Sequence, residues 1–352
     1  MEDLLVHNFT IASKAGDYSV EFDNALLDNN SLTNLGTHYI IDKKVFALLG
    51  EKFYKNIQSK EIVLIDADEN TKSYQGIEPV IVQLIEKKLN RSSHLVAIGG
   101  GITQDITCFI ATTFMRGLSW TFVPTTLLAQ ADSCIGSKSS INFGNYKNIL
   151  GSFNPPNRVI INEHFLKSLD EKDIKSGIGE IIKLYIVDGK LVSADEIRNH
   201  LSFHLYRTLK IKQRFIEEDE FDKGIRNILN YGHCFGHAIE SATNFGIPHG
   251  IAVTIGMDIA NKLSLHKNLI NDTMYNDLHK ILFDNYKDYC QTMIDKNKVY
   301  SALTKDKKNT GNTINIILPV KGNLTKYSFD NQPSFWKLLD DVIETMSIKI
   351  QS

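Results

Sequence analysis

Hydrophobic and polar positions follow two alternating patterns along the first half of the chain. Short apolar runs typical of buried strands occupy residues 39–41, 62–65, 95–98, 120–123 and 159–161. The segments between them carry apolar residues at helical spacing, near residues 43–57, 76–89, 102–115 and 125–134. This alternation predicts an α/β domain with a mostly parallel, Rossmann-like sheet that helices cover on both faces. Ligands of such sheets bind beyond the carboxyl ends of the strands.

The pattern changes near residue 168. Helical periodicity dominates from there to about residue 300, and only residues 313–319 indicate a later strand. No internal repeat, low-complexity tract or proline-rich linker marks the boundary. We therefore predict an α/β domain over residues 1–168 and a mainly α-helical domain over residues 169–352.

The stretch from residue 97 to residue 158 holds the first candidate chemistry. An apolar strand runs into Gly99, Gly100 and Gly101, and a helix-forming run follows. Glycines at this position let backbone N–H groups approach a diphosphate, and the start of a helix favours its negative charge. An ordinary tight turn between a strand and a helix explains the three glycines equally well.

Charged residues near this stretch favour a nucleotide and a phosphorylated ligand. Asp42 ends one predicted strand, and Glu69 and Lys72 follow another, at places where cofactor-binding side chains are common. Plain loop charge is the simpler interpretation of each of them alone. Farther along, one carboxylate, two cations and an amide lie among small residues, and they are Asp132, Lys138, Lys147 and Asn148. We interpret this second group as a site for a phosphorylated polyol beside a nucleotide.

Residues 226–240 predict a buried helix with one polar side. The polar residues are spaced 4, 3, 4 and 3 positions apart, which places them on one side of a helix, and Asp222 extends that side by one turn. They are Arg226, Asn230, His233, His237 and Glu240. Almost all other positions are apolar, so we expect the polar side to line a cavity rather than to face solvent.

The same segment offers candidate metal ligands. His233 and His237 are one helical turn apart, and His249 stands where the sequence predicts a helix start. Glu180 and Lys183 share a face of another helix. Each histidine alone is more often a hydrogen-bonded core residue. One carboxylate with two or three imidazoles, however, is a donor set for a divalent metal that leaves a position open for substrate, as catalytic zinc requires.

Composition limits the partners and the compartment. The chain has 39 basic and 41 acidic side chains among 352 residues, so charge gives no reason to expect binding to nucleic acid or membrane. No apolar run approaches about 18 residues, and Glu2 and Asp3 differ from the basic start of a signal peptide. Four scattered cysteines without a CxxC pair suit reduced thiols. We expect a soluble, cytoplasmic protein.

Several motifs in order resemble the 3-dehydroquinate synthase family and its sugar-phosphate cyclase relatives. They are GGGITQD, MRG, PTTLLAQADS, GSK, KN, GEIIK, RNILNYGHCFGHAIE and HG-AV-IGM, with DKK at 306–308. The resemblance is dense from about residue 95 to residue 258 and thinner outside. It implies an NAD-binding α/β domain, a helical metal domain of the dehydroquinate synthase-like fold, an active site in the cleft, and a homodimer.

The resemblance also implies a role for particular residues. The ligands of zinc, or of cobalt in its place, would be Glu180, His233 and His249. NAD would be held by Asp42, Glu69, Lys72, Gly100, Gly101, Asp105, Thr125 and Thr126. The sugar phosphate would contact Asp132, Lys138, Lys147, Asn148, Lys183, Lys212, Arg226, Asn230, His237 and Lys307 or Lys308. Arg116 would reach the phosphate of the substrate in the neighbouring subunit.

The reaction implied by the resemblance converts 3-deoxy-D-arabino-heptulosonate 7-phosphate to 3-dehydroquinate and phosphate, in the shikimate pathway to aromatic amino acids. NAD would take and return a hydride, zinc would polarise the reacting oxygens, and the leaving phosphate would act as the base. Arg226 and Lys212 would receive the substrate carboxylate. Leu229 agrees with this, because a related cyclase group that uses a neutral hexose phosphate carries a glutamate there.

Several positions depart from the family pattern and keep alternatives open. Residues 136–140 read GSKSS where GGKTG is usual, Asp222 and Ile251 stand where glutamates are usual, and Cys234 replaces a common threonine. A cyclase for another sugar phosphate is one alternative, and a sugar-phosphate binder without activity is another. An NAD-dependent metal alcohol dehydrogenase is a third, but it would not need Lys138, Lys147 and Asn148.

Overall fold

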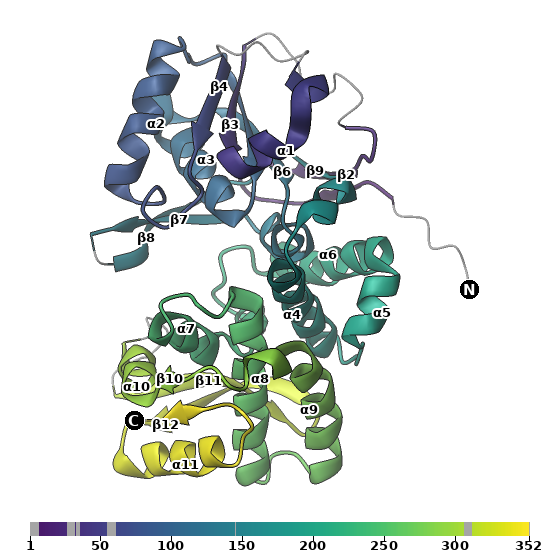
Figure 1. Cartoon of the computed structure of the whole chain (residues 1–352), viewed down its shortest axis with the longest axis vertical. Coiled ribbons are helices and arrows are strands. Elements are labelled where there is room, and N and C mark those ends of the chain that lie inside the picture. The colour runs from purple at the N-terminus through teal and green to yellow at the C-terminus, as the bar shows by residue number, and fades with distance from the viewer. Residues whose placement is uncertain are drawn as a thin grey trace. The chain divides into compact units, whose positions relative to one another are not determined.

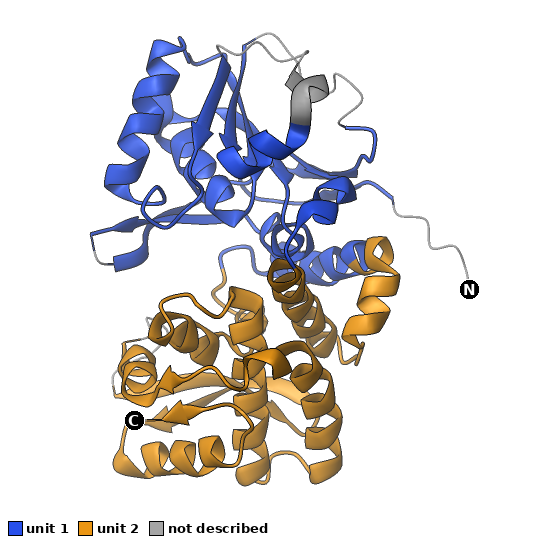
Figure 2. Ribbon diagram, viewed as in Figure 1, with its two compact units in different colours: residues 1–170, 205–221 blue, residues 171–204, 222–352 orange. Residues whose placement is uncertain are grey.

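The computed structural model describes residues 7–26, 32, 36–54, 61–144, 146–305 and 312–351. The chain divides into two compact units (Figure 2): unit 1 contains residues 1–170 and 205–221, and unit 2 contains residues 171–204 and 222–352. Residues 205–221 thus belong with the first part of the chain, whereas the sequence pattern assigns them to the second domain. Their apolar side chains Leu209 and Ile216 lie in the core of unit 1, which explains the grouping.

Unit 1 is built on a seven-stranded sheet with the order β1-β2-β9-β6-β5-β3-β4 (Figure 1). All neighbouring strands are parallel except β1 and β2. The strands are β1 (Phe9–Ile11), β2 (Tyr18–Phe22), β3 (Thr37–Asp42), β4 (Ile62–Ile65), β5 (His94–Gly99), β6 (Ser119–Pro124) and β9 (Arg158–Ile161). The five strands predicted from apolar runs are therefore confirmed.

Two apolar clusters cover the two faces of this sheet. One contains buried residues of α2 (Tyr74–Glu86), α3 (Gly101–Thr113) and α6 (Leu201–Glu218), and the other packs against α1 (Lys43–Tyr54). The predicted helices are confirmed within the described residues, although residues 55–57 lie outside them. The last expected helix, 125–134, is mainly a short π-helix, Ala129–Ser133. Short 3-10 turns lie at Phe114–Arg116, after α3, and at Glu163–Ser168, after β9.

A β-hairpin occupies the segment in which the sequence indicated only small and polar residues. Strand β7 (Lys138–Phe143) pairs with β8 (Tyr146–Phe153) in antiparallel register. The sequence missed both strands because serine and asparagine interrupt their alternation. Ile141 nevertheless lies in the core of unit 1, and this anchors the hairpin.

Unit 2 is mainly helical. Its helices are α4 (Glu171–Val187), α5 (Ala194–Asn199), α7 (His233–Ala242), α8 (His249–His266), α9 (Asp272–Tyr286), α10 (Lys296–Thr304) and α11 (Pro333–Glu344), with 3-10 turns η5 (Ile225–Asn230) and η6 (Lys287–Tyr289). The late strand predicted from the sequence is confirmed as β11 (Thr313–Val320). It pairs with β12 (Asn323–Asp330), which was not predicted, and β10 (Ile294–Asp295) pairs with β13 (Ile350–Gln351).

Helix α8 is buried along most of its length, and two glycines let its backbone pack against neighbouring backbone. A Cβ atom on Gly250 would lie 1.8 Å from the carbonyl oxygen of Ser176 in α4. A Cβ atom on Gly256 would lie 2.1 Å from the carbonyl oxygen of Gly232, just before α7. Because no larger residue fits at either place, α4, α7 and α8 are held at fixed, close distances.

Two further findings concern the whole described part of the chain. None of the described helices is long and apolar enough to span a membrane. All four cysteines are buried and carry free thiols.

A buried carboxylate in the middle of α8 gives a testable stability prediction. Asp258 is fully buried, and one of its oxygens accepts hydrogen bonds from Tyr286 Oη, 2.5 Å away, and from His279 Nδ1, 2.7 Å away. The bond to Asp258 raises the pKa of His279, and partial burial of the ring offsets this by less. A raised pKa means that the charged pair stabilises the fold fully below about pH 6.5 and less as the pH rises through the folded pKa.

We therefore expect His279→Phe, which keeps an aromatic ring, to lower the free energy of unfolding by about 2 kcal/mol near pH 6 and by less near pH 9. Urea denaturation at both pH values measures the difference. His266→Phe, at the exposed last residue of α8, is the control. An equal or larger loss near pH 9 would contradict the charged pair.

Candidate metal and cofactor sites

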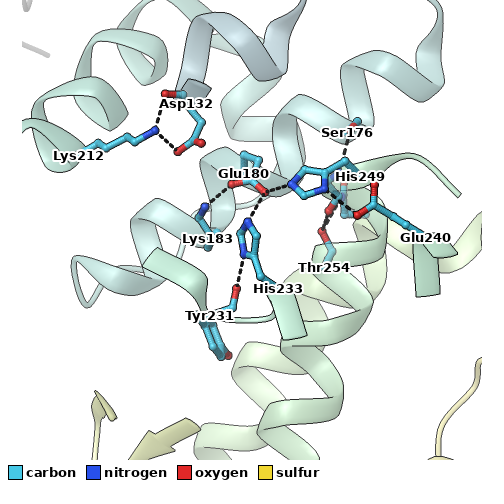
Figure 3. Close-up of polar contacts among 12 residues, drawn as sticks. Asp132, Ser176, Glu180, Lys183, Lys212, Tyr231, His233, Glu240, His249 and Thr254 are labelled. Atoms are coloured by element: carbon cyan, nitrogen blue, oxygen red, sulfur yellow. Dashed lines mark hydrogen bonds and ion pairs between the residues drawn. The ribbon is translucent and has the colours of Figure 1, made fainter. Parts of the chain in front are cut away.

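Three elements of unit 2 bring the predicted metal ligands together (Figure 3). Glu180 extends from the middle of α4, His233 is the first residue of α7, and His249 is the first residue of α8. Glu180 Oε1 lies 3.4 Å from His249 Nε2 and 3.7 Å from His233 Nε2. The carboxylate is only 1% exposed. Two imidazole nitrogens therefore face one buried carboxylate oxygen.

The prediction of one continuous helix over residues 226–240 is wrong, although two of its polar residues, His233 and His237, do lie together in α7. The 3-10 turn η5 ends at Asn230, Tyr231 leaves the helical conformation, and Gly232 adopts a left-handed conformation with φ +78° before α7 begins. Periodicity alone does not show this break, which the packing of Gly232 against α8 imposes. Asp222, expected one turn back on the same helix, lies outside it with φ +56°.

His237 also reaches the cluster. The ligand atoms of His233, His237 and His249 all lie within 4.8 Å of one another. The rings of His237 and His249 stack with centroids 5.6 Å apart. The structure thus brings together all three imidazoles that the sequence offered, in addition to the Glu180 carboxylate.

The donor set fits a divalent cation such as zinc or cobalt. Among the described residues, Glu180 Oε1 has no hydrogen-bond partner although it is buried, and an unsatisfied buried oxygen is costly. A cation bound between this oxygen and the imidazole nitrogens would satisfy it. Carboxylate and imidazole are ordinary ligands of zinc, and three protein ligands leave a position open.

Charges around the cluster hold the carboxylate in its ionised form. Lys183, itself 2% exposed, contacts Glu180 Oε2. Burial would raise the pKa of Glu180, but Lys183 and His249 hold it well below its usual range. Burial would also lower the pKa of His249, but the Glu240 and Glu180 carboxylates outweigh this and raise that pKa to about 10.

The glycine turn of unit 1 fits a diphosphate. Gly100 stands immediately before α3 and has no side chain that could cap the first N–H groups of the helix. A Cβ atom on Gly100 would lie 3.1 Å from Thr126 Cγ2, so a side chain there would crowd this turn. Thr125 N donates to Gly99 O across the ends of β6 and β5. Gly100, Gly101, Thr125 and Thr126 therefore share one edge of the sheet, and Asp42 ends the adjacent strand β3.

Two other residues assigned to NAD form a polar cluster with the β7–β8 hairpin. Lys72 Nζ lies 2.5 Å from Asp105 Oδ2, and Ser140 N donates to Asp105 Oδ1. Burial raises the pKa of Asp105, and the Lys72 ammonium opposes that shift without cancelling it. Asp105 is thus engaged with the protein itself, which the glycine-turn motif gave no reason to expect.

Asn142 connects Glu69, which is also assigned to NAD, with residues assigned to the substrate. Its Nδ2 donates to Glu69 Oε2, 2.8 Å away, and its Oδ1 accepts from Asn148 N, 3.0 Å away. Lys147 Nζ lies 3.2 Å from the same Glu69 oxygen. Sequence reasoning missed Asn142. The only hint was its place next to Ile141, a residue of the core.

The remaining predicted residues lie in separate places within their units. In unit 1, Lys212 Nζ donates to Asp132 O and lies 3.2 Å from Asp132 Oδ1, while Lys138 and Arg116 are exposed. In unit 2, Arg226 is buried on η5, and Asn230 ends that turn. Lys307 and Lys308 lie outside the described residues.

Comparison with known proteins decides the family. The model of the 3-dehydroquinate synthase N-terminal part matches residues 62–176, and that of the C-terminal part matches residues 177–309. A 3-dehydroquinate synthase from Campylobacter concisus is 34% identical over 322 residues, which cover 89% of this chain and 92% of that protein. The chain belongs to the 3-dehydroquinate synthase family.

Solved structures agree with the fold of the 3-dehydroquinate synthase family. A 2-deoxy-scyllo-inosose synthase complexed with carbaglucose-6-phosphate, NAD+ and Co2+ aligns with a TM-score of 0.82 at 22% identity, over 97% of this chain and 100% of that one. A 2-epi-5-epi-valiolone synthase from Streptomyces hygroscopicus with NAD+ and Zn2+ bound aligns with a TM-score of 0.78 at 23% identity, over 95% and 99%. The resemblance and the fold class expected from the sequence are thereby confirmed.

The positions that depart from the 3-dehydroquinate synthase pattern are structurally distinct. Ile251 is fully buried in α8, and Cys234 is buried in α7. Ser137 adopts φ +64°, a conformation easier for the usual glycine, and its hydroxyl donates to Glu220 Oε1 at 3.2 Å. The hydrogen bond offsets part of the cost of placing a serine there.

Proposed function

We propose that the chain is a 3-dehydroquinate synthase that converts 3-deoxy-D-arabino-heptulosonate 7-phosphate to 3-dehydroquinate and phosphate. The overall conversion combines a transient oxidation, phosphate elimination, reduction and an intramolecular aldol closure. The observation that carries the proposal is the buried Glu180 carboxylate oxygen faced by two imidazoles, in a chain of this family. The solved cyclases that share the fold contain NAD and a divalent metal, which supports the same pair of cofactors here.

The residues that would hold the cofactors belong to different units. Glu180, His233 and His249 would bind zinc or cobalt, and the edge of the sheet with Gly100, Gly101 and Thr125 would bind NAD. When bound, the nicotinamide supplies a reversible hydride acceptor and the metal supplies a Lewis acid. The chain contributes an ionised carboxylate in a dry setting, which increases the strength of its electrostatic interactions.

The remaining side chains would bind and orient the sugar phosphate. Cationic and amide groups suit the phosphate, since charge-assisted hydrogen bonds to it are strong. Those we assign to the phosphate are Lys138, Asn148, His237 and Arg116. Lys183 and Asn230 would orient ring hydroxyls. Asp132 and Lys147, which lie close in sequence to Lys138 and Asn148, would also contact the substrate. Arg226 and Lys212 would receive the carboxylate.

We further propose a cytoplasmic homodimer in which Arg116 serves the partner's site. Arg116 is exposed and holds φ +75°, and Met115 beside it holds φ +48°, so the backbone presents both side chains outward at some cost. Unit 1 also exposes Tyr74, Phe143 and Tyr146, an apolar surface of the kind that marks an interface. Four buried free thiols suit a reducing compartment.

The direct test measures released phosphate and carbocycle with the protein, zinc and a catalytic amount of NAD. The acid substrate should be compared with sedoheptulose 7-phosphate and glucose 6-phosphate. We expect turnover of the acid, phosphate release far in excess of added NAD, and no steady accumulation of NADH. Stoichiometric NADH would support an alcohol dehydrogenase instead. Faster turnover of a neutral sugar phosphate would support a related cyclase.

A substitution at Arg226 tests the substrate carboxylate separately. Arg226→Ala should lower kcat/KM for the acid by at least about 10-fold, because a planar carboxylate loses its guanidinium partner. Arg198→Ala, which removes a half-buried arginine of α5 that pairs with Glu171, is the matched control and should leave kcat/KM unchanged. If Arg226→Ala has no effect, the carboxylate assignment is wrong.

A further inference from the structure

We propose that Glu240 is a positioning residue that fixes the tautomer and the ring orientation of His249, and thereby strengthens metal binding at the Glu180, His233 and His249 cluster. The inference rests on the metal-binding part of the proposed function. It concerns a side chain outside the ligand set, and it predicts a property of the protein that is measurable without substrate or NAD.

The geometry places Glu240 behind the ring of His249. Glu240 Oε2 lies 2.9 Å from His249 Nδ1, while Nε2 of the same ring faces Glu180 Oε1 at 3.4 Å (Figure 3). The Glu240 carboxylate is only 12% exposed. The ring is therefore held between two carboxylates, one at each nitrogen.

The chemistry of the two ring nitrogens decides which of them carries the hydrogen and which can bind a metal. An ionised carboxylate only accepts hydrogen bonds, so the nitrogen that faces Glu240 carries the hydrogen. With a cation bound the ring is neutral, and a hydrogen held on Nδ1 then leaves the lone pair on Nε2, the atom that faces the other ligands. A carboxylate that accepts the hydrogen bond of Nδ1 also makes Nε2 more basic, which strengthens the bond of Nε2 to a metal.

The second histidine of the cluster is supported differently. His233 Nδ1 lies 3.3 Å from the carbonyl oxygen of Tyr231, a neutral acceptor at longer range. The contact at Nδ1 of His249 is therefore shorter than that at Nδ1 of His233, and its acceptor is a carboxylate rather than a neutral carbonyl. Glu240 follows His233 by seven residues, so α7 carries a ligand at its first residue and the support for the other ligand two turns later.

Cobalt binding by purified full-length protein tests the proposal, with a competing chelator to measure affinity and visible absorption to report the coordination geometry. We expect Glu240→Ala to weaken Co2+ binding by 10- to 100-fold, an effect of about the size found for such supporting residues. Glu240→Gln keeps the side-chain length and an accepting oxygen, and should lose less. Both variants should shift the cobalt absorption bands relative to the unchanged protein.

Ser241→Ala, the next and exposed residue of α7, is the matched control and should leave affinity and spectrum unchanged. Unchanged affinity and spectrum in a folded Glu240→Ala protein would overturn the proposal. Complete loss of cobalt, equal to that of His249→Ala, would overturn it too, because Glu240 would then be a ligand itself. If Glu240→Ala does not fold, the same criteria apply to Glu240→Gln. Metal binding with no turnover of any sugar phosphate would refute the proposed function alone.

Discussion

Removal of divalent metal should abolish turnover of the sugar phosphate, and one equivalent of zinc or cobalt should restore it. The reason is the convergence of Glu180, His233 and His249 from three helices onto one buried point. Without a cation, the reacting oxygens lose the Lewis acid that family chemistry requires. Dialysis against a chelator, followed by back-titration and a phosphate-release assay, measures the effect. Full activity in protein shown to be free of metal would refute the requirement.

The histidine variants sharpen this prediction. We expect His233→Ala to lose more bound metal than His237→Ala, since His237 is assigned to the substrate. The three rings lie close enough that geometry alone leaves His237 available as a ligand. Metal content of each purified variant, measured by elemental analysis, therefore separates the two roles. Equal loss in both would move His237 into the ligand set.

The second large effect concerns stability. Lys183→Met should lower the free energy of unfolding of metal-free protein by about 3 kcal/mol, because it leaves the Glu180 carboxylate buried without its ammonium partner. Added zinc or cobalt should recover much of this loss, since the cation replaces the missing positive charge. Urea denaturation with and without metal measures both changes.

A lysine one helical turn beyond the end of α4 provides the control. Lys190 pairs with Asp188 but is 47% exposed, so Lys190→Met should change the free energy of unfolding by less than about 0.5 kcal/mol. The double variant Glu180→Gln, Lys183→Met should be more stable than Lys183→Met alone. Equal stability of the two methionine variants would contradict the buried pair.

The sequence predicted the elements whose signal is local. Strands β3, β4, β5, β6 and β9 are apolar and rich in β-branched residues, so they were visible as runs, whereas β1 and β2 were not predicted. The candidate metal ligands were visible from the spacing of His233 and His237 and from the helix start at His249. The β7–β8 hairpin was missed because Ser139, Ser140 and Asn142 hide its alternation, and its pairing depends on the core contact of Ile141.

Other features depend on contacts that a pattern cannot show. The break at Gly232 follows from its packing against α8, whereas the hydrophobic period runs through it without a change. The support of His249 by Glu240 depends on the turn that returns the chain from α7 to α8. Likewise, the ion pair of Asp105 with Lys72 joins two segments that sequence spacing treats separately.

The return of residues 205–221 to unit 1 has a consequence for anyone who wishes to study the two units apart. A fragment that stops at residue 170 would lack Leu209 and Ile216 from its core. It would also lose the hydrogen bond that Gln213 Nε2 donates to Thr10 O in β1, and the one that Glu217 Oε1 accepts from Ala12 N just after β1. Simple truncation would thus expose apolar surface and favour aggregation. Isolating unit 1 calls for a gene in which the segment for α6 is grafted behind residue 170 through a designed linker.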